Sequence, residues 1–191
     1  MTTLYFIYRD DPGPVLWSVS GTTRPDLSFD TGLRLLQPPD GTPDTPGAYM
    51  VQNGTLAPRA PTLAENRFAK TGAATAQFNA LIAAGFAQGG TLFQIDSAAQ
   101  ASIAAMGVMA LGSIADPAGS PWPDGFYWIA ADNTHVAMDA AATYGFGRAA
   151  GAYVSACVLR LRAIKDAIAS APDQAALDAI DVTAGYPPAG V

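Results

Sequence analysis

The chain has 191 residues, of which half are apolar and only 14% are charged, and its formal net charge is −6. This length allows one good core or two small domains. Between Lys70 and Arg148 there is no Lys or Arg, while five Asp residues fall there. Nucleic-acid binding rewards clustered basic residues, so composition and charge argue against a nucleic-acid site. Aromatic and β-branched residues occur throughout, which predicts an ordered protein with much of its surface covered, in part by partners.

The only cysteine, Cys157, excludes an intrachain disulfide and a thiol-rich metal site. It lies inside a helical apolar pattern, which favours a packed core thiol over a reactive one. No uninterrupted apolar run approaches the roughly 20 residues needed to span a bilayer, and the N-terminus lacks a secretory pattern. We therefore expect no membrane insertion and a protein of the cytoplasm or of a particle assembled there.

Residues 1–61 are expected to form a small β-rich module. Nine of the fifteen prolines lie in this segment and break any helix. Strands are expected at residues 3–8, 15–19, 33–36, 49–52 and 55–57. The Asn53-Gly54 pair between the last two strands predicts a hairpin with a type I′ turn.

Residues 62–191 are expected to form a mainly helical domain, so the predicted fold class is α+β. Thr62 and Glu65 have capping-box spacing and predict a helix that ends near Gly85. A turn at 89–90 and a short strand follow. Asp96 or Ser97 then begins a second helix, to about residue 114, with capping-box spacing between Ser97 and Gln100. Further helices are expected over residues 139–171, with Asp139 as cap, and 173–180.

Two of these helices carry unusual apolar surfaces. The helix over 97–114 is apolar on every side, so it must be buried, either in the core of its own domain or between subunits. The long helix carries one continuous apolar stripe with steps of three and four residues: Phe146, Ala150, Tyr153, Cys157, Leu161, Ile164, Ile168 and Ala171. Both surfaces need cover, which predicts self-association, or assembly with other proteins, that survives high salt.

The stretch 122–138 gathers two of the three tryptophans and the only histidine. Its pattern predicts a hairpin near 126–136, with a strand over 126–130, a turn at Asp132-Asn133 and a return strand over 134–136. Within it we expect Trp128 to be buried and His135 to be a dispensable turn residue.

No catalytic constellation is apparent, and we expect neither an enzyme nor a bound cofactor or metal. His135 is the one candidate general base, but no Gly-x-Ser-x-Gly elbow supplies a nucleophile. Four aspartates could meet at a cation, although no calcium-loop spacing occurs and their roles as helix caps or turn residues explain each one. The glycines of 85–90 lack the Lys and Ser/Thr of a phosphate loop. The aromatic cluster at 122–128 could stack a sugar or base, but is more typical of a core or subunit interface.

The order of several motifs suggests a family. These are Gly85-Phe86, Phe93-Gln94-Ile95-Asp96, Gln100, Ile103, Trp122-Pro123, Phe126, Trp128, Ala131-Asp132-Asn133, Val136, Met138, Ala152-Tyr153 and Lys165 before a closing Ala-rich helix. Residues 62–187 with these motifs resemble the phage-tail domain called domain of unknown function 4376. Where that family usually has Thr before the long helix, this chain has Asp139. The N-terminal pattern from Tyr49 to Arg59 is similar to short β modules that precede such domains in phage tail-region proteins.

The resemblance implies a virion tail protein or a tail-fibre helper encoded by a phage or prophage, assembled in the host cytoplasm. One hypothesis is a structural component of the fibre, tip or baseplate that contacts other tail proteins and copies of itself. The other is an assembly chaperone that binds the fibre end. A three-fold arrangement suits the first, and a dimer or one-to-one partner the second. The family supplies no catalytic residues. The candidate structural or interface residues are Phe93, Asp96, Trp122, Phe126, Trp128, Asp132, Asn133 and Tyr153.

Overall fold

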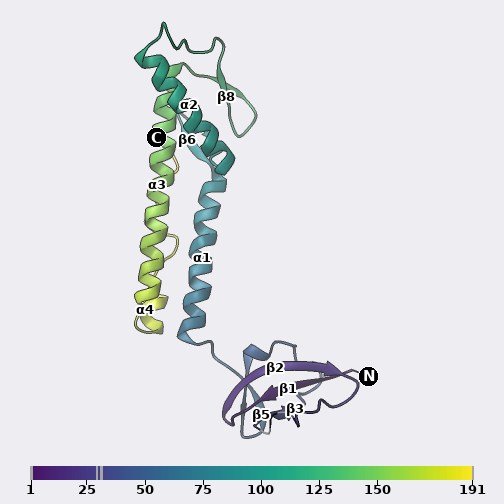
Figure 1. Ribbon diagram of the computed structural model, residues 1–191. Coiled ribbons are helices and arrows are strands. Elements are labelled where there is room, and N and C mark those ends of the chain that lie inside the picture. The colour runs from purple at the N-terminus through teal and green to yellow at the C-terminus, as the bar shows by residue number, and fades with distance from the viewer. Residues whose placement is uncertain (1, 29, 31, 191) are drawn as a thin grey trace. The chain divides into compact units, whose positions relative to one another are not determined.

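A computed structural model describes residues 2–28, 30 and 32–190 (Figure 1). The chain divides into two compact units, Met1–Glu65 and Asn66–Val191, which are described separately. The first is a β-sheet and the second is mainly helical with two short hairpins, so the predicted α+β class is confirmed.

The first unit contains one five-stranded antiparallel sheet in the order β3-β1-β2-β4-β5. Its strands are β1 (Thr3–Tyr8), β2 (Gly13–Gly21), β3 (Arg34–Leu36), β4 (Tyr49–Gln52) and β5 (Thr55–Pro58), with a 3-10 turn η1 (Pro46–Ala48) before β4. Side chains alternate between faces along a strand. Phe6 and Tyr8 of β1 therefore share one face, where they form a buried cluster with Val15 and Val51.

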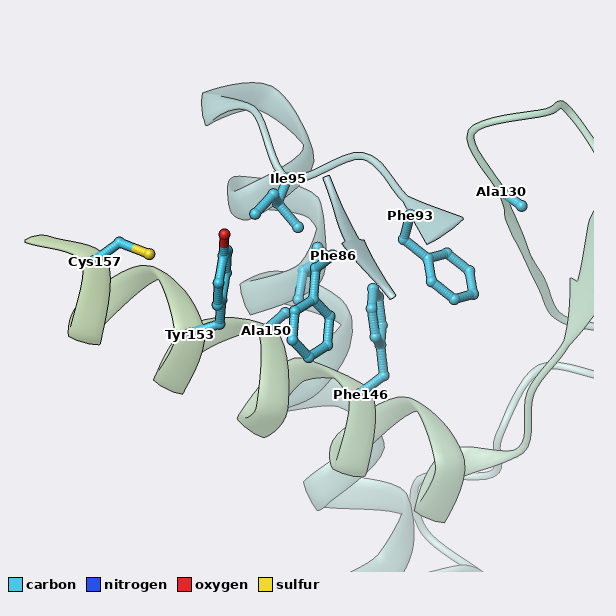
Figure 2. Close-up of a cluster of buried hydrophobic side chains, with 9 residues drawn as sticks. Phe86, Phe93, Ile95, Ala130, Phe146, Ala150, Tyr153 and Cys157 are labelled. Carbon is cyan, nitrogen blue, oxygen red and sulfur yellow. The ribbon is translucent and has the colours of Figure 1, made fainter. Parts of the chain in front are cut away.

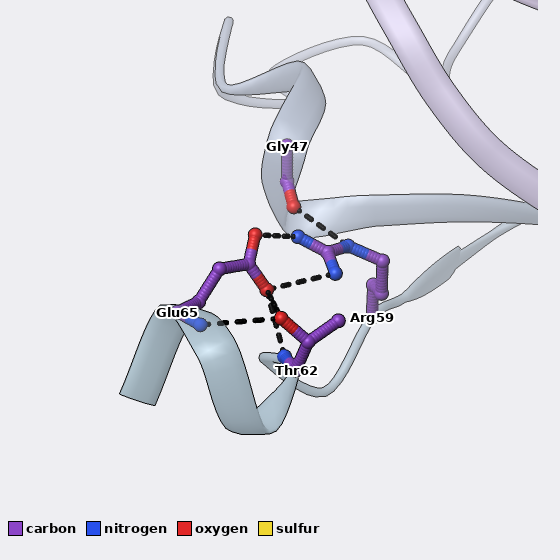
Figure 3. A network of polar contacts seen from close by, with 4 residues as sticks. All are labelled: Gly47, Arg59, Thr62 and Glu65. Carbon is purple, nitrogen blue, oxygen red and sulfur yellow. Dashed lines mark hydrogen bonds and ion pairs between the residues drawn. The ribbon is translucent and has the colours of Figure 1, made fainter. Parts of the chain in front are cut away.

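Two sequence signals in this unit are confirmed at the level of atoms. Asn53 and Gly54 both have positive φ, as a type I′ turn requires, and the Asp11 carboxylate accepts hydrogen bonds from both of their amides at 2.7 Å. At the start of α1 (Leu63–Ala84), the Thr62 amide donates to Glu65 Oε2 at 2.7 Å and the Glu65 amide donates to Thr62 Oγ1 at 3.2 Å. The predicted capping box is therefore formed (Figure 3).

The helical unit is built on three long helices. These are α1, α2 (Ser97–Ala115) and α3 (Ala140–Ser170), followed by the short α4 (Gln174–Asp178). Hairpin β6 (Phe86–Gln88) and β7 (Thr91–Phe93) connects α1 to α2, and hairpin β8 (Tyr127–Ile129) and β9 (His135–Ala137) precedes α3. In Figure 1, α1 and α2 each run beside a different part of α3, which is about 46 Å long at 1.5 Å per residue.

The core of this unit lies where the first half of α3 meets the β6–β7 hairpin (Figure 2). Rings pack directly: Phe93 and Phe146 have centroids 4.6 Å apart, and Phe86 and Tyr153 have centroids 5.5 Å apart. Every member of the predicted α3 stripe is buried except Leu161, which is half-buried, and its first four members belong to this core.

Helix α2 packs against α3 through a close backbone approach. A Cβ added to Gly147 of α3 would lie 3.6 Å from Ile103 Cγ2 and 3.9 Å from Gly107 Cα of α2. Both distances are ordinary van der Waals contacts, so the two helices lie close together at this point, where Ile103 is buried.

The C-terminal segment is fixed to the helices and is not a free tail. Arg67 and Lys70 of α1 donate to the carbonyl oxygens of Ala171 and Leu177, both at 2.5 Å, near the ends of α3 and α4. Basic side chains suit these positions because the last carbonyls of a helix have no helical partner. Further along, the Ala87 amide of β6 donates to Ala189 at 2.8 Å.

Several expectations are wrong in detail. Gln100 does not complete a capping box with Ser97; its side-chain amide donates to the Ile95 carbonyl at 2.7 Å, while Asp96 is the cap of α2. Two strands, 86–88 and 91–93, flank the turn at 89–90, where the sequence pattern predicts only one short strand. Trp128 is half-buried and not buried, because its two-stranded hairpin is covered on one face only.

The largest correction concerns α2, which is not buried in the core of its own domain. Of its 19 residues only Ile103, Ala110 and Ser113 are buried. Among the described residues, α2 is also the one helix long and apolar enough to cross a membrane by length and composition, although Ser and Gln residues interrupt its apolar run. Within the chain, a single face of α2 is covered by α3 and the hairpins.

Candidate functional site

Four of the candidate residues form one continuous row of aromatic contacts. Trp122 meets Phe126 edge-on at 4.9 Å, Phe126 meets Trp128 at 5.8 Å, and Trp128 meets Phe146 at 5.7 Å. Phe93 then packs on Phe146. The indole Nε1 of Trp122 donates to the Met138 carbonyl at 3.1 Å, which closes the base of the β8–β9 hairpin. The row therefore attaches the hairpin to the core.

Three other candidates have backbone roles away from this row. Asp96 Oδ1 accepts the Ala99 amide at 2.9 Å as the cap of α2. Asp132 Oδ1 accepts the amide and the hydroxyl of Thr134 at 3.0 and 2.7 Å, and the backbone bond is the main reason that the pKa of this carboxyl is lowered. Asn133 has φ of 67°, a conformation that Asn tolerates better than most residues. These residues shape the loops and do not converge on one point.

Tyr153 and the two residues with catalytic potential are held in structural positions. Burial raises the pKa of Tyr153 to about 12 and also raises the pKa of the Cys157 thiol, so both stay protonated in the core. His135 lies on β9, exposed, with its ring stacked on Tyr127 at 4.0 Å. The predicted core thiol is confirmed. His135 lies on the return strand expected over 134–136, so its interpretation as a turn residue is wrong.

The most unusual surface of the unit is formed by exposed apolar side chains in the C-terminal half of α2. We call Val108, Met109, Leu111 and Ile114 the α2 outer face. Their exposed fractions are 72%, 52%, 48% and 46%. No charged residue occurs anywhere in α2. Sequence periodicity could not reveal this face, because a helix that is apolar on all sides does not indicate which side its own domain covers.

A cleft of about 310 Å³ lies between α2 and β8. Ala99, Ser102 and Met106 line one wall and residues 126–129 line the other, with Phe93 and Phe146 also lining it. The sequence predicts the aromatic cluster, but it predicts neither this cleft nor the central position of Phe146. A signal for Phe146 is present in the sequence, since this residue begins the apolar stripe of α3.

Comparison with known proteins gives one family match, which covers most of the helical unit. The family model described as Domain of unknown function (DUF4376) matches residues 65–184, more than half of the chain. The chain belongs to this family. The DUF4376 region begins at the capping-box glutamate and contains the whole helical core, both hairpins and the α2 outer face. No curated protein and no solved structure matched the chain.

Proposed function

We propose that this chain is a structural component of a phage or prophage-derived tail, in the fibre, tip or baseplate, and that it acts by protein–protein assembly. The observation that carries the assembly role is the α2 outer face. Large exposed apolar patches on soluble proteins mark association sites. The tail context rests on the resemblance of the motifs and of the N-terminal β module to phage tail-region proteins.

The exposed side of α2 also has the spacing of a helix–helix interface. Ala101, Ala104, Val108, Leu111 and Ala115 are all exposed, and they follow one another by three, four, three and four residues. Steps of this kind place apolar side chains on one seam, as in coiled coils. A second copy of α2 offers a matching seam without any charge that would be buried, which supports self-association in addition to contacts with other tail proteins.

A protein partner fits α2 better than a lipid bilayer. The helix is about 28 Å long, close to the thickness of a bilayer core. However, its ends are flanked by Asp96 and Asp116, and the nearest basic residues in sequence are Lys70 and Arg148. Membrane-spanning helices are usually flanked by Lys and Arg on the cytoplasmic side. We therefore infer no membrane insertion, and flotation with liposomes tests this: the protein should remain at the bottom of the gradient.

The proposed role requires no catalysis, cofactor or nucleic acid. The only histidine is stacked on a tyrosine at the surface and the only thiol is buried. Five aspartates and no Lys or Arg lie between Lys70 and Arg148 in the sequence, which disfavours a nucleic-acid partner. The localisation we propose, a virion tail component assembled in the bacterial cytoplasm, rests on the family resemblance alone.

The second candidate is a tail-fibre assembly chaperone that binds the fibre end. The division of a small chain into a β unit and a helical unit fits this role equally. Mass spectrometry of purified particles separates the two. Stoichiometric amounts support the structural component, whereas absence from particles together with loss of fibres on gene deletion supports the chaperone.

A further inference from the structure

The cleft between α2 and β8 has an open strand edge as one wall. Strand β8 belongs to a two-stranded sheet in which, among the described residues, it pairs only with β9. The Ala130 amide donates to Thr134, and the Met138 amide donates to Phe126. The carbonyl of Phe126 and the backbone groups of residues 128 and 130 therefore point toward β9. The alternating residues Tyr127 and Ile129 direct theirs toward the opposite edge.

This edge borders the cleft. Four consecutive residues, 126–129, line it. Because successive side chains point to opposite faces of a strand, four consecutive lining residues mean that the backbone edge itself faces the cleft. At the far end of the same edge, the Ala131 amide already donates to the Leu92 carbonyl at 2.8 Å. Among the described residues, this edge thus forms one backbone hydrogen bond, at Ala131, and the backbone groups of Tyr127 and Ile129 remain available to a further strand.

The other walls of the cleft suit a ligand that has an apolar side chain with Lys or Arg next to it. Phe93, Ile103 and Phe146 lie in the core cluster beneath the cleft, and Met106 of α2 lines it. Asp96 follows the lining residue Gln94 by two positions, and Asp124 precedes Phe126 by two. Both aspartates are exposed, and no Lys or Arg occurs from residue 71 to 147.

We propose that the α2–β8 cleft binds an extended segment of a partner protein, which adds a strand to the edge of β8 and places an apolar side chain in the cleft, with Lys or Arg beside it. Main-chain hydrogen bonds supply affinity in this mode of recognition and pockets for alternate side chains supply specificity. The basic residues complement Asp96 and Asp124, which lie two residues in sequence from residues that line the cleft. The inference rests on the proposed assembly role only in taking a protein as the partner.

The test uses the full-length protein and a library of ten-residue peptides in which Val, Ile, Leu or Phe alternates with Lys or Thr. We expect binding to protect the amides of Tyr127 and Ile129 from hydrogen exchange. Libraries with Glu in place of Lys, or with N-methylated backbone amides, should bind at least tenfold more weakly. Absence of binding at millimolar peptide concentration, or equal binding of the N-methylated library, would overturn the proposal.

A matched pair of variants locates the site on α2. Ser102 lines the cleft, whereas Ala105 lies outside it on the same helix, and both are exposed. Ser102→Phe should weaken peptide binding at least tenfold and Ala105→Phe by less than twofold. Equal effects of the two variants, or none from Ser102→Phe, would contradict the location. Peptide binding does not depend on whether the protein is found in particles, so it can fail while the tail assignment holds.

Discussion

Glu65 is the only glutamate in the chain, and it has several partners at once (Figure 3). Its carboxylate pairs with Arg59 at 2.5 Å and accepts the amide and hydroxyl of Thr62. The Arg59 side chain, followed by Thr62, lowers the pKa of Glu65 to about 2. Because this carboxylate is exposed to solvent, the shift indicates its partners more than it measures stability.

We predict that the carboxyl carbon of Glu65 titrates at about pH 2 in a carbon NMR experiment. The folded-state pKa lies below the ordinary value of 4.5, so the stabilisation by Glu65 is fully present above pH 4.5 and is lost as the pH falls toward 2. Arg59→Ala should raise the pKa more than Thr62→Ala does, since Arg59 is the larger cause. A titration near 4.5 in the unmodified protein would contradict the network.

A second prediction at this scale compares three side chains near the aromatic row. Phe146→Ala should lower the free energy of unfolding by about 3–5 kcal/mol, because the ring is fully buried. Trp128→Ala should cost roughly half of that because the indole is half-buried. His135→Ala should cost less than about 0.5 kcal/mol, since the ring is exposed. Urea denaturation followed by circular dichroism measures all three, and a loss of fold in His135→Ala would refute its dispensable role.

At the scale of elements, the sequence determines where helices and turns begin and end. Caps predict these starts correctly, since Thr62, Asp96 and Asp139 all accept the expected backbone amides. Sequence patterns could not predict which side of α2 is covered, because apolar residues surround the helix. The position of the β8–β9 hairpin against α2 determines the half-buried state of Trp128 and the cleft beside it. Local periodicity in the sequence does not encode this position.

Replacement of two glycines, one inside α3 and one at the end of α1, by alanine should change the stability of the protein in opposite directions. Gly147 lies inside α3 with ordinary space for a Cβ, so Gly147→Ala should stabilise the protein by about 1 kcal/mol through helix propensity. Gly85 ends α1 with φ of +88°, and an added Cβ would lie 2.6 Å from the Phe93 carbonyl oxygen. Gly85→Ala should therefore destabilise it by more than about 1 kcal/mol. Thermal unfolding of both variants decides the matter, and stabilisation by Gly85→Ala would be inconsistent with this backbone geometry.

At the scale of the whole molecule, each unit has a buried cluster of its own, and the helical unit also leaves one side of an uncharged helix exposed. An apolar face without charges should associate through burial of surface and not through ion pairs, so its association should be insensitive to salt. The amino-acid composition, with few charges for its length, by itself predicts association of this kind.

The central claim is that the α2 outer face is covered by protein in the assembled state, and sedimentation velocity at micromolar concentration tests it most directly. The unmodified protein should sediment as an oligomer in both 0.1 M and 1 M NaCl. Val108→Asp should sediment as a folded monomer, because Val108 is the most exposed member of the face. Ala110→Asp, on the buried side of the same helix, should instead lower the free energy of unfolding. An unmodified protein that is monomeric at both salt concentrations would contradict self-association through α2.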